Sequence, residues 1–104
     1  MKAIQLDDLK KKLDNENVKL VEVLDEDAYK AEHIKGAINI PLERIGTEAK
    51  DKFDKNDEII VYCSSYSCSA SPTAAKKLES LGFNNVYDFE GGKKEWKDAG
   101  LPME

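Results

Sequence analysis

The segment from Ile59 to Gly82 most constrains how this chain can fold. Four apolar residues that favour β-structure, Ile59–Tyr62, predict a short buried strand that leads directly into Cys63 and a loop of small residues. The following residues Thr73–Leu81 are typical of a helix, and Gly82 is its predicted C-terminal stop. We therefore expect Cys63 to lie between the end of a strand and the beginning of a helix.

A cysteine in this position is a candidate nucleophile. The loop is expected to point backbone N–H groups inward, and the positive end of the helix dipole would face the sulfur. Such surroundings lower the pKa of a thiol from about 8.5 to between about 3.5 and 7.5. We therefore expect Cys63 to react as a thiolate near neutral pH. The alternative is a buried structural cysteine at the end of a strand.

Candidate strands and helices alternate along the rest of the chain. The predicted strands lie in residues 2–4, 18–24, 59–62 and 82–89, and the predicted helices in 7–13, 25–31, 42–53, 73–81 and 90–102. This alternation indicates an α/β fold with a mainly parallel central sheet. No repeat, low-complexity tract or linker interrupts it, so residues 1–104 are predicted to form a single domain.

The composition excludes several classes of function. A net charge of -5 argues against nucleic acid or an anionic membrane as a partner. No apolar run approaches the roughly 18 residues of a membrane span, and no signal peptide is evident, so we expect a cytoplasmic protein. Two cysteines and one histidine predict neither a disulfide framework nor a metal site, and no cofactor is expected.

The cysteine loop resembles the active-site loop of rhodanese-like domains, a sulfurtransferase family whose single-domain members carry a persulfide on one cysteine. The family pattern is Cys-Arg-x-Gly-x-Arg-Ser. The cysteine, the loop length and the closing serine match, whereas both arginines and the glycine are replaced. The residues here are Cys63, Ser64, Ser65, Tyr66, Ser67, Cys68 and Ser69.

Two further motifs are similar to this family. The stretch from His33 to Pro41 matches most of the family pattern Gly-His-Ile-x-Gly-Ala-x-Asn-Ile-Pro. The chain closes with Gly91-Gly92, Trp96 and Gly100-Leu101-Pro102, which resembles the family's final helix. At these positions we expect His33 to fix a turn before a short buried strand, and Trp96 to anchor the last helix in the core. The resemblance implies a mainly parallel five-stranded sheet with helices on both faces.

The resemblance also implies a reaction. Cys63 would attack a sulfane sulfur, carry it as a persulfide and pass it to a thiol or to cyanide, with residues 64–69 forming the substrate-binding loop. Thiosulfate needs its sulfonate held, usually by arginine, so polysulfide or a protein persulfide is the expected donor. Arg44, the single arginine of the chain, is a candidate contact for an anionic substrate.

Three alternatives stay open at the level of the sequence. Cys68 could resolve a persulfide on Cys63, which would make the pair a thiol-disulfide redox couple. Phosphatases and arsenate reductases use a related cradle, but Ser69 occupies the place of their arginine. The fold could also serve as a binding or regulatory module without turnover.

Overall fold

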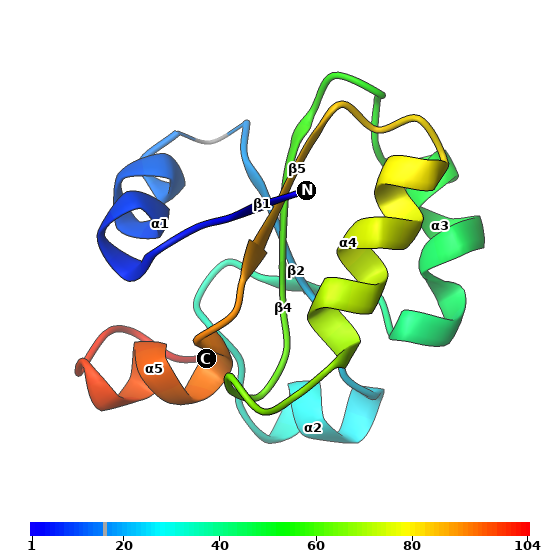
Figure 1. Ribbon diagram of the computed structural model, residues 1–104. Helices are drawn as coiled ribbons and strands as arrows, with labels where there is room; N and C mark the ends of the chain where they lie inside the picture. The colour runs from blue at the N-terminus through cyan, green and yellow to red at the C-terminus, as the bar shows by residue number, and fades with distance from the viewer. Residues whose placement is uncertain (16) are drawn as a thin grey trace.

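A five-stranded sheet forms the centre of the molecule (Figure 1). The computed structural model describes residues 1–15 and 17–104. Neighbouring strands run parallel in the order β1-β5-β4-β2-β3, which confirms the predicted fold class. The strands are β1 (Lys2–Ala3), β2 (Lys19–Glu22), β3 (Ile38–Asn39), β4 (Glu58–Tyr62) and β5 (Asn85–Phe89).

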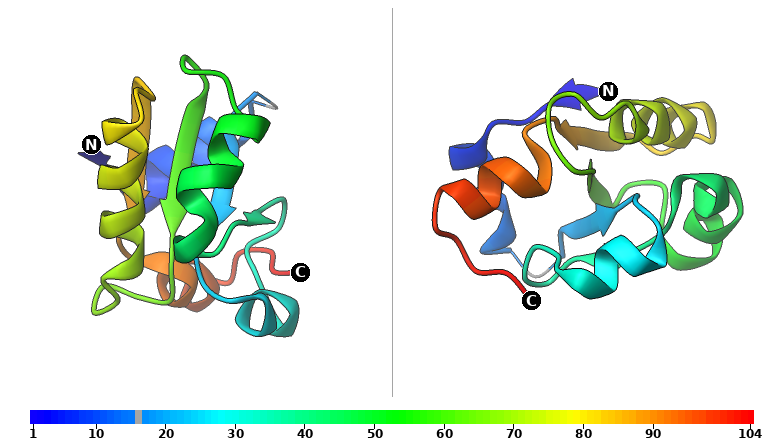
Figure 2. Two further views of the ribbon diagram at one scale, coloured as in Figure 1. Left: turned by 90° about the vertical axis from the view of Figure 1, so that its right-hand side faces the viewer. Right: turned by 90° about the horizontal axis from the view of Figure 1, so that it is seen from below.

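Helices cover both faces of the sheet, as the resemblance implied. Figure 2 shows α1 and α5 on one side of the strands and α3 and α4 on the other. Within the described ranges no helix has the length and apolar character needed to cross a membrane. The helical elements are α1 (Leu6–Leu13), α2 (Glu26–Ala31), the short 3-10 turn η1 (Leu42–Arg44), α3 (Ile45–Lys52), α4 (Ala70–Ser80) and α5 (Gly92–Asp98).

Alternation along the strands divides the core into two layers. In β4, Val61 packs with Ala74 and Leu78 of α4, whereas the completely buried Tyr62 faces the layer that contains Leu9 and Trp96. Successive side chains of a strand point to opposite faces of a sheet, so a strand covered on both sides is apolar throughout. This explains the continuous apolar run that the sequence shows before Cys63.

The element boundaries differ from the predictions at two places that concern the site. The helix α4 begins at Ala70, three residues before the predicted start, and Pro72 lies in its first turn, where an N–H group has no acceptor within the helix. The strand that follows His33 is not buried, because Ile38 in β3 is exposed at the edge of the sheet.

Candidate functional site

Cys63 follows β4, the middle strand of the sheet. It is 1% exposed and packs in the layer beneath α4. Its carbonyl oxygen accepts a hydrogen bond of 2.9 Å from the backbone N–H of Lys93 in α5, and that of Ser64 accepts one of 2.9 Å from Lys94. The loop after Cys63 is therefore held between the first turn of α5 and the beginning of α4, at the lower edge of Figure 1.

Gly92 allows α5 to approach this closely. Its φ is +64°, and a Cβ atom at this position would lie 2.6 Å from the carbonyl oxygen of Cys63. Real Cβ atoms do not come this close to a backbone oxygen, so any other residue would push the helix and the loop apart. The glycine pair of the closing motif thus positions the cysteine loop.

The Cys63 sulfur contacts Cys68 of the predicted loop and Ser71, which lies beyond it. The thiol lies 3.6 Å from the carbonyl oxygen of Cys68 and 3.4 Å from the Oγ atom of Ser71, so its single proton can be donated to either oxygen. The loop is tightened by a bond of 3.0 Å from the N–H of Cys68 to the carbonyl of Ser65. The side chains of Ser64, Tyr66, Ser67 and Ser69 are exposed, whereas Ser65 and Cys68 are half-buried.

The two thiols differ in acidity. Burial raises the pKa of Cys63, and its hydrogen bond with the Cys68 thiol raises it further, although the hydroxyl and the N–H of Ser71 act in the opposite direction. Burial also acts to raise the pKa of Cys68, but hydrogen bonds from the Cys63 thiol, from the N–H of Ala70 and from Ser64 outweigh it, so that this pKa is lowered.

The expectation of a lowered Cys63 pKa is therefore wrong for this arrangement. The sulfur of Cys63 lies at the floor of the loop, where little solvent reaches it, and a thiolate loses solvation there. The N–H groups at the beginning of α4 bond to different sulfurs. The N–H of Ser71 lowers the pKa of Cys63, and the N–H of Ala70 lowers the pKa of Cys68. The sequence alone did not indicate how deep each sulfur lies.

Two buried polar residues were not predicted from the sequence: Ser71, whose hydroxyl lies 3.4 Å from this sulfur, and Asp88, which lies on the same face of the sheet. Ser71 in α4 and Asp88 in β5 are each completely buried. Neither carboxylate oxygen of Asp88 has a hydrogen-bond partner among the described residues. Burial raises the pKa of Asp88, the hydroxyl of Ser71 acts against this rise, and the charge of Glu90 adds to it. An acidic residue within an otherwise β-forming segment was the available signal.

A buried ion pair supports the loop from the other face of the sheet. Glu22 in β2 is completely buried, and its Oε2 atom accepts a bond of 3.1 Å from the Nζ atom of Lys93. Its Oε1 atom accepts a bond of 2.8 Å from the hydroxyl of Tyr62, which in turn accepts one of 3.1 Å from the N–H of Ile34. Lys93 also donates to the carbonyl of Ala28, at 3.1 Å. This network joins β2, β4, α2 and α5 directly beside Cys63.

Arg44 is paired with two carboxylates. Its guanidinium bonds to Glu48 one turn along the helix and, at 3.2 Å, to Glu26 of α2. An anionic substrate would have to compete with both of these carboxylates for Arg44. The geometry therefore does not favour the predicted anion contact.

His33 and Trp96 have the structural contacts expected of them. The Nδ1 atom of His33 lies 2.9 Å from the carbonyl oxygen of Tyr29, and the two rings stack with centroids 3.8 Å apart. Trp96 is 6% exposed, and its Nε1 atom donates a bond of 2.8 Å to the carbonyl of Pro102. Both residues thereby fix chain turns by bonding to the backbone.

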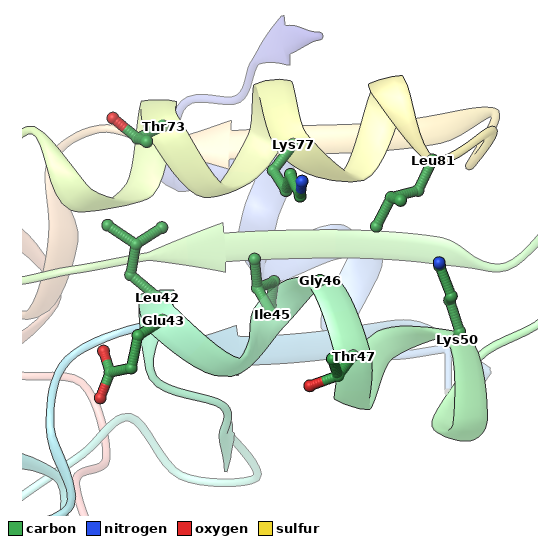
Figure 3. A pocket seen from close by; sticks show the side chains of 9 residues that line it. All are labelled: Leu42, Glu43, Ile45, Gly46, Thr47, Lys50, Thr73, Lys77 and Leu81. Carbon is green, nitrogen blue, oxygen red and sulfur yellow. The ribbon is translucent and has the colours of Figure 1, made fainter.

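Two of the hollows on the described surface concern possible binding sites. One, of about 250 Å³, borders the cysteine loop and is lined by Ser65, Tyr66, Gly91, Lys94, Glu95 and Asp98. The other, of about 420 Å³, runs between α3 and α4, where Figure 3 shows Leu42 near Thr73 at one end and Lys50 near Leu81 at the other, with Lys77 between them. All residues that line this second groove belong to 42–50 or 73–81, so it does not border the cysteine loop. Among residues 1–15 and 17–104, no three His, Cys, Asp or Glu side chains gather as metal ligands would.

Comparison with known proteins places these features in a wider group. The sequence pattern of the Rhodanese-like domain family matches residues 5–99. A protein of Coxiella burnetii named thiosulfate sulfurtransferase GlpE is 34% identical over 81 residues, which cover 78% of this chain and 73% of that protein.

Two further relatives resemble nearly the whole chain. The HTH-type transcriptional regulator Rv0324 of Mycobacterium tuberculosis is 32% identical over 102 residues, covering 98% of this chain but only 44% of the regulator. The crystal structure of the BH2092 protein from Bacillus halodurans superposes with a TM-score of 0.91 at 31% identity, covering 99% of this chain and 76% of that one. The shared architecture therefore extends over almost every element described above.

Proposed function

Because the chain belongs to the family of rhodanese-like domains, we propose that it is a sulfurtransferase that carries sulfane sulfur as a persulfide on Cys63. The observation that carries this proposal is the position of Cys63, which lies at the end of β4 with its sulfur 3.4 Å from Ser71 in the first turn of α4. Backbone N–H groups and the helix dipole there stabilise negative charge on a terminal sulfur.

The transfer takes place in two displacements. In the first, the Cys63 thiolate attacks the outer sulfur of the donor, and the bond between that sulfur and the rest of the donor breaks. The electron pair of this bond leaves with the donor, which becomes a thiolate if it was a protein persulfide and a shorter polysulfide if it was a polysulfide. In the second, an acceptor thiolate or cyanide attacks the outer sulfur of the Cys63 persulfide, and Cys63 leaves as a thiolate. The hollow beside Ser65 and Tyr66 is the proposed approach for both donor and acceptor.

The proposed donor is polysulfide or a protein persulfide. Residues 64–69 contain no arginine, and the guanidinium of Arg44 is already paired with Glu26 and Glu48. A sulfonate would thus find only neutral hydroxyl and amide donors in the loop, which bind an anion less strongly than arginine does. The relatives named thiosulfate sulfurtransferase support sulfur transfer in general, and the donor preference is our proposal for this chain.

Intact-mass analysis tests this function. The reduced protein is treated separately with polysulfide and with thiosulfate, and the experiment is repeated with Cys63→Ser and Cys68→Ser. We expect the mass of one sulfur atom to be gained readily from polysulfide and poorly from thiosulfate, and to be lost only in Cys63→Ser. A protein that gains no sulfur from either donor would contradict the proposal and favour a binding or regulatory module.

The contact between the two thiols favours a second candidate, a redox couple. The Cys63 thiol hydrogen-bonds to Cys68, whose pKa is lowered. A Cys68 thiolate could attack the inner sulfur of the Cys63 persulfide, which would release HS⁻ and leave a Cys63–Cys68 disulfide for a thiol reductant to reopen. The same mass experiment distinguishes this candidate, because it predicts a loss of two hydrogens that requires both cysteines.

A further inference from the structure

Asp88 is an unexplained polar residue in the core. It lies in β5 between β1 and β4, where its register partners are Ala3 and Val61, and its side chain is completely buried. Neither carboxylate oxygen has a hydrogen-bond partner among the described residues. A buried carboxyl group without a partner lowers the stability of the fold, and such groups are often found at functional sites.

Ser71 connects Asp88 to the site. Asp88 is two residues beyond Val86, which packs beneath α4 in the same layer as Val61 and Cys63, so its side chain lies on the face of the sheet that carries the sulfur. Ser71 projects into this layer from the first turn of α4, and its Oγ atom lies 3.4 Å from the sulfur of Cys63. The same hydroxyl group lowers the pKa of the Asp88 carboxyl group, against the effect of burial.

We propose that Asp88 accepts and returns the proton of Cys63 through the hydroxyl group of Ser71, as a positioning residue for the sulfur transfer proposed above. This inference deepens that function and depends on it for its biological meaning. The relay requires the hydroxyl group of Ser71 to move within hydrogen-bonding distance of an Asp88 oxygen, since neither oxygen has a partner among the described residues. Ser71 keeps its contact with the Cys63 thiol during this movement.

The proton balance of the relay is simple. The S–H bond of Cys63 breaks as its proton passes to Ser71, and the hydroxyl proton of Ser71 passes to a carboxylate oxygen of Asp88. The serine stays neutral, the sulfur becomes a thiolate that accepts a hydrogen bond from Ser71, and Asp88 becomes a carboxylic acid. When Cys63 leaves its persulfide as a thiolate, Asp88 returns the proton along the same path.

The surroundings suit a shared proton. Burial raises the pKa of Asp88, which makes its carboxylate a stronger base than an exposed one. Moving the proton shifts one negative charge from carboxylate to sulfur and leaves the buried charge of the pair unchanged, so no second charge is buried. Two other titratable groups affect the pair. Cys68 raises the pKa of the Cys63 thiol, and the charge of Glu90 raises the pKa of the Asp88 carboxyl group.

Site-resolved NMR titration tests the relay without measuring sulfur transfer. The ¹³C shifts of the Cys63 Cβ and the Asp88 carboxyl carbon are followed against pH in the whole reduced protein. We expect both nuclei to titrate with the same two midpoints, as coupled groups do. Asp88→Asn should remove from the Cys63 titration the midpoint that it shares with Asp88, and Ser71→Ala should separate the midpoints of the two residues.

Controls and kinetics complete the test. Asp51→Asn, an exposed change on α3, should leave the titration of Cys63 unchanged. The rate of persulfide formation from polysulfide near neutral pH should fall about tenfold in Asp88→Asn, the effect of one pKa unit. Unrelated midpoints in the unaltered protein, or a Cys63 titration unchanged in both Asp88→Asn and Ser71→Ala, would overturn the relay. If Asp88→Asn does not fold, Ser71→Ala decides the question. A coupled titration in a protein that gains no sulfur would instead contradict only the sulfurtransferase function.

Discussion

Lys93 and Glu22 form an ion pair with 3.1 Å between Nζ and Oε2, although the Glu22 side chain is completely buried. They are 71 positions apart in the chain, so the pair joins the beginning of α5 to the end of β2. The backbone N–H of the same lysine bonds to the carbonyl of Cys63. Lys93 thus both neutralises the buried charge of Glu22 and holds the loop that begins at Cys63, the proposed catalytic residue.

Lys93→Ala should strongly destabilise the protein. It would leave the Glu22 carboxylate buried without its cation, and removal of one partner from a buried pair costs about 3–5 kcal/mol. We expect this loss in the free energy of unfolding, measured by urea denaturation. Lys97→Ala is the matched control, because the pair of Lys97 with Glu32 is exposed and contributes little. Equal losses in the two variants would contradict a structural role for the buried pair.

The sequence predicted the features of the site that depend on neighbouring residues. Cys63 was correctly placed at the end of a strand, because the apolar run before it and the helix after it are local patterns. The burial of Asp88 without a partner and the contact of Glu22 with Lys93 were not predicted, because they arise only when the sheet brings distant segments together. The pKa of Cys63 was predicted in the wrong direction for the same reason, since the depth of its sulfur depends on the packing of α4 and α5.

Gly92→Ala should disturb the cysteine loop. The positive φ of Gly92 costs an alanine about 1–2 kcal/mol, and the close approach of its Cβ to the carbonyl oxygen of Cys63 adds to this cost. We expect a lower free energy of unfolding and slower persulfide formation. Gly100→Ala is the matched control, because Gly100 has a φ of +73° but open space around its Cβ position. A similar loss of stability in both variants, with unchanged persulfide formation, would contradict this role of Gly92.

The stability of the protein should depend on pH through Asp88. Burial, in spite of Ser71, raises the pKa of this carboxyl group above the value of about 3.9 that it has in an unfolded chain. Between these two values the folded chain holds a proton that the unfolded chain has lost. The stability due to Asp88 is therefore fully present below about pH 3.9 and is lost as the pH rises through the folded value.

Asp88→Asn should remove this dependence. Urea unfolding of both proteins from about pH 4 to about pH 8 would show the stability of the unaltered protein falling relative to that of the variant. Circular dichroism at each pH verifies that both proteins begin folded. A difference in the free energy of unfolding that does not change with pH would show that the carboxyl group of Asp88 has an ordinary pKa.

Ser64→Arg should improve the use of thiosulfate. Ser64 is exposed in the loop and stands where the family pattern has its first arginine, so a guanidinium there could bind a sulfonate next to Cys63. A charge-assisted hydrogen bond contributes about 1.5–3 kcal/mol, which corresponds to roughly a ten- to hundredfold gain in persulfide formation from thiosulfate. The rate with polysulfide should change little, because its reactive sulfur does not need an arginine. Ser64→Gln, similar in length but uncharged, is the control, and an equal gain in that variant would contradict the charge argument.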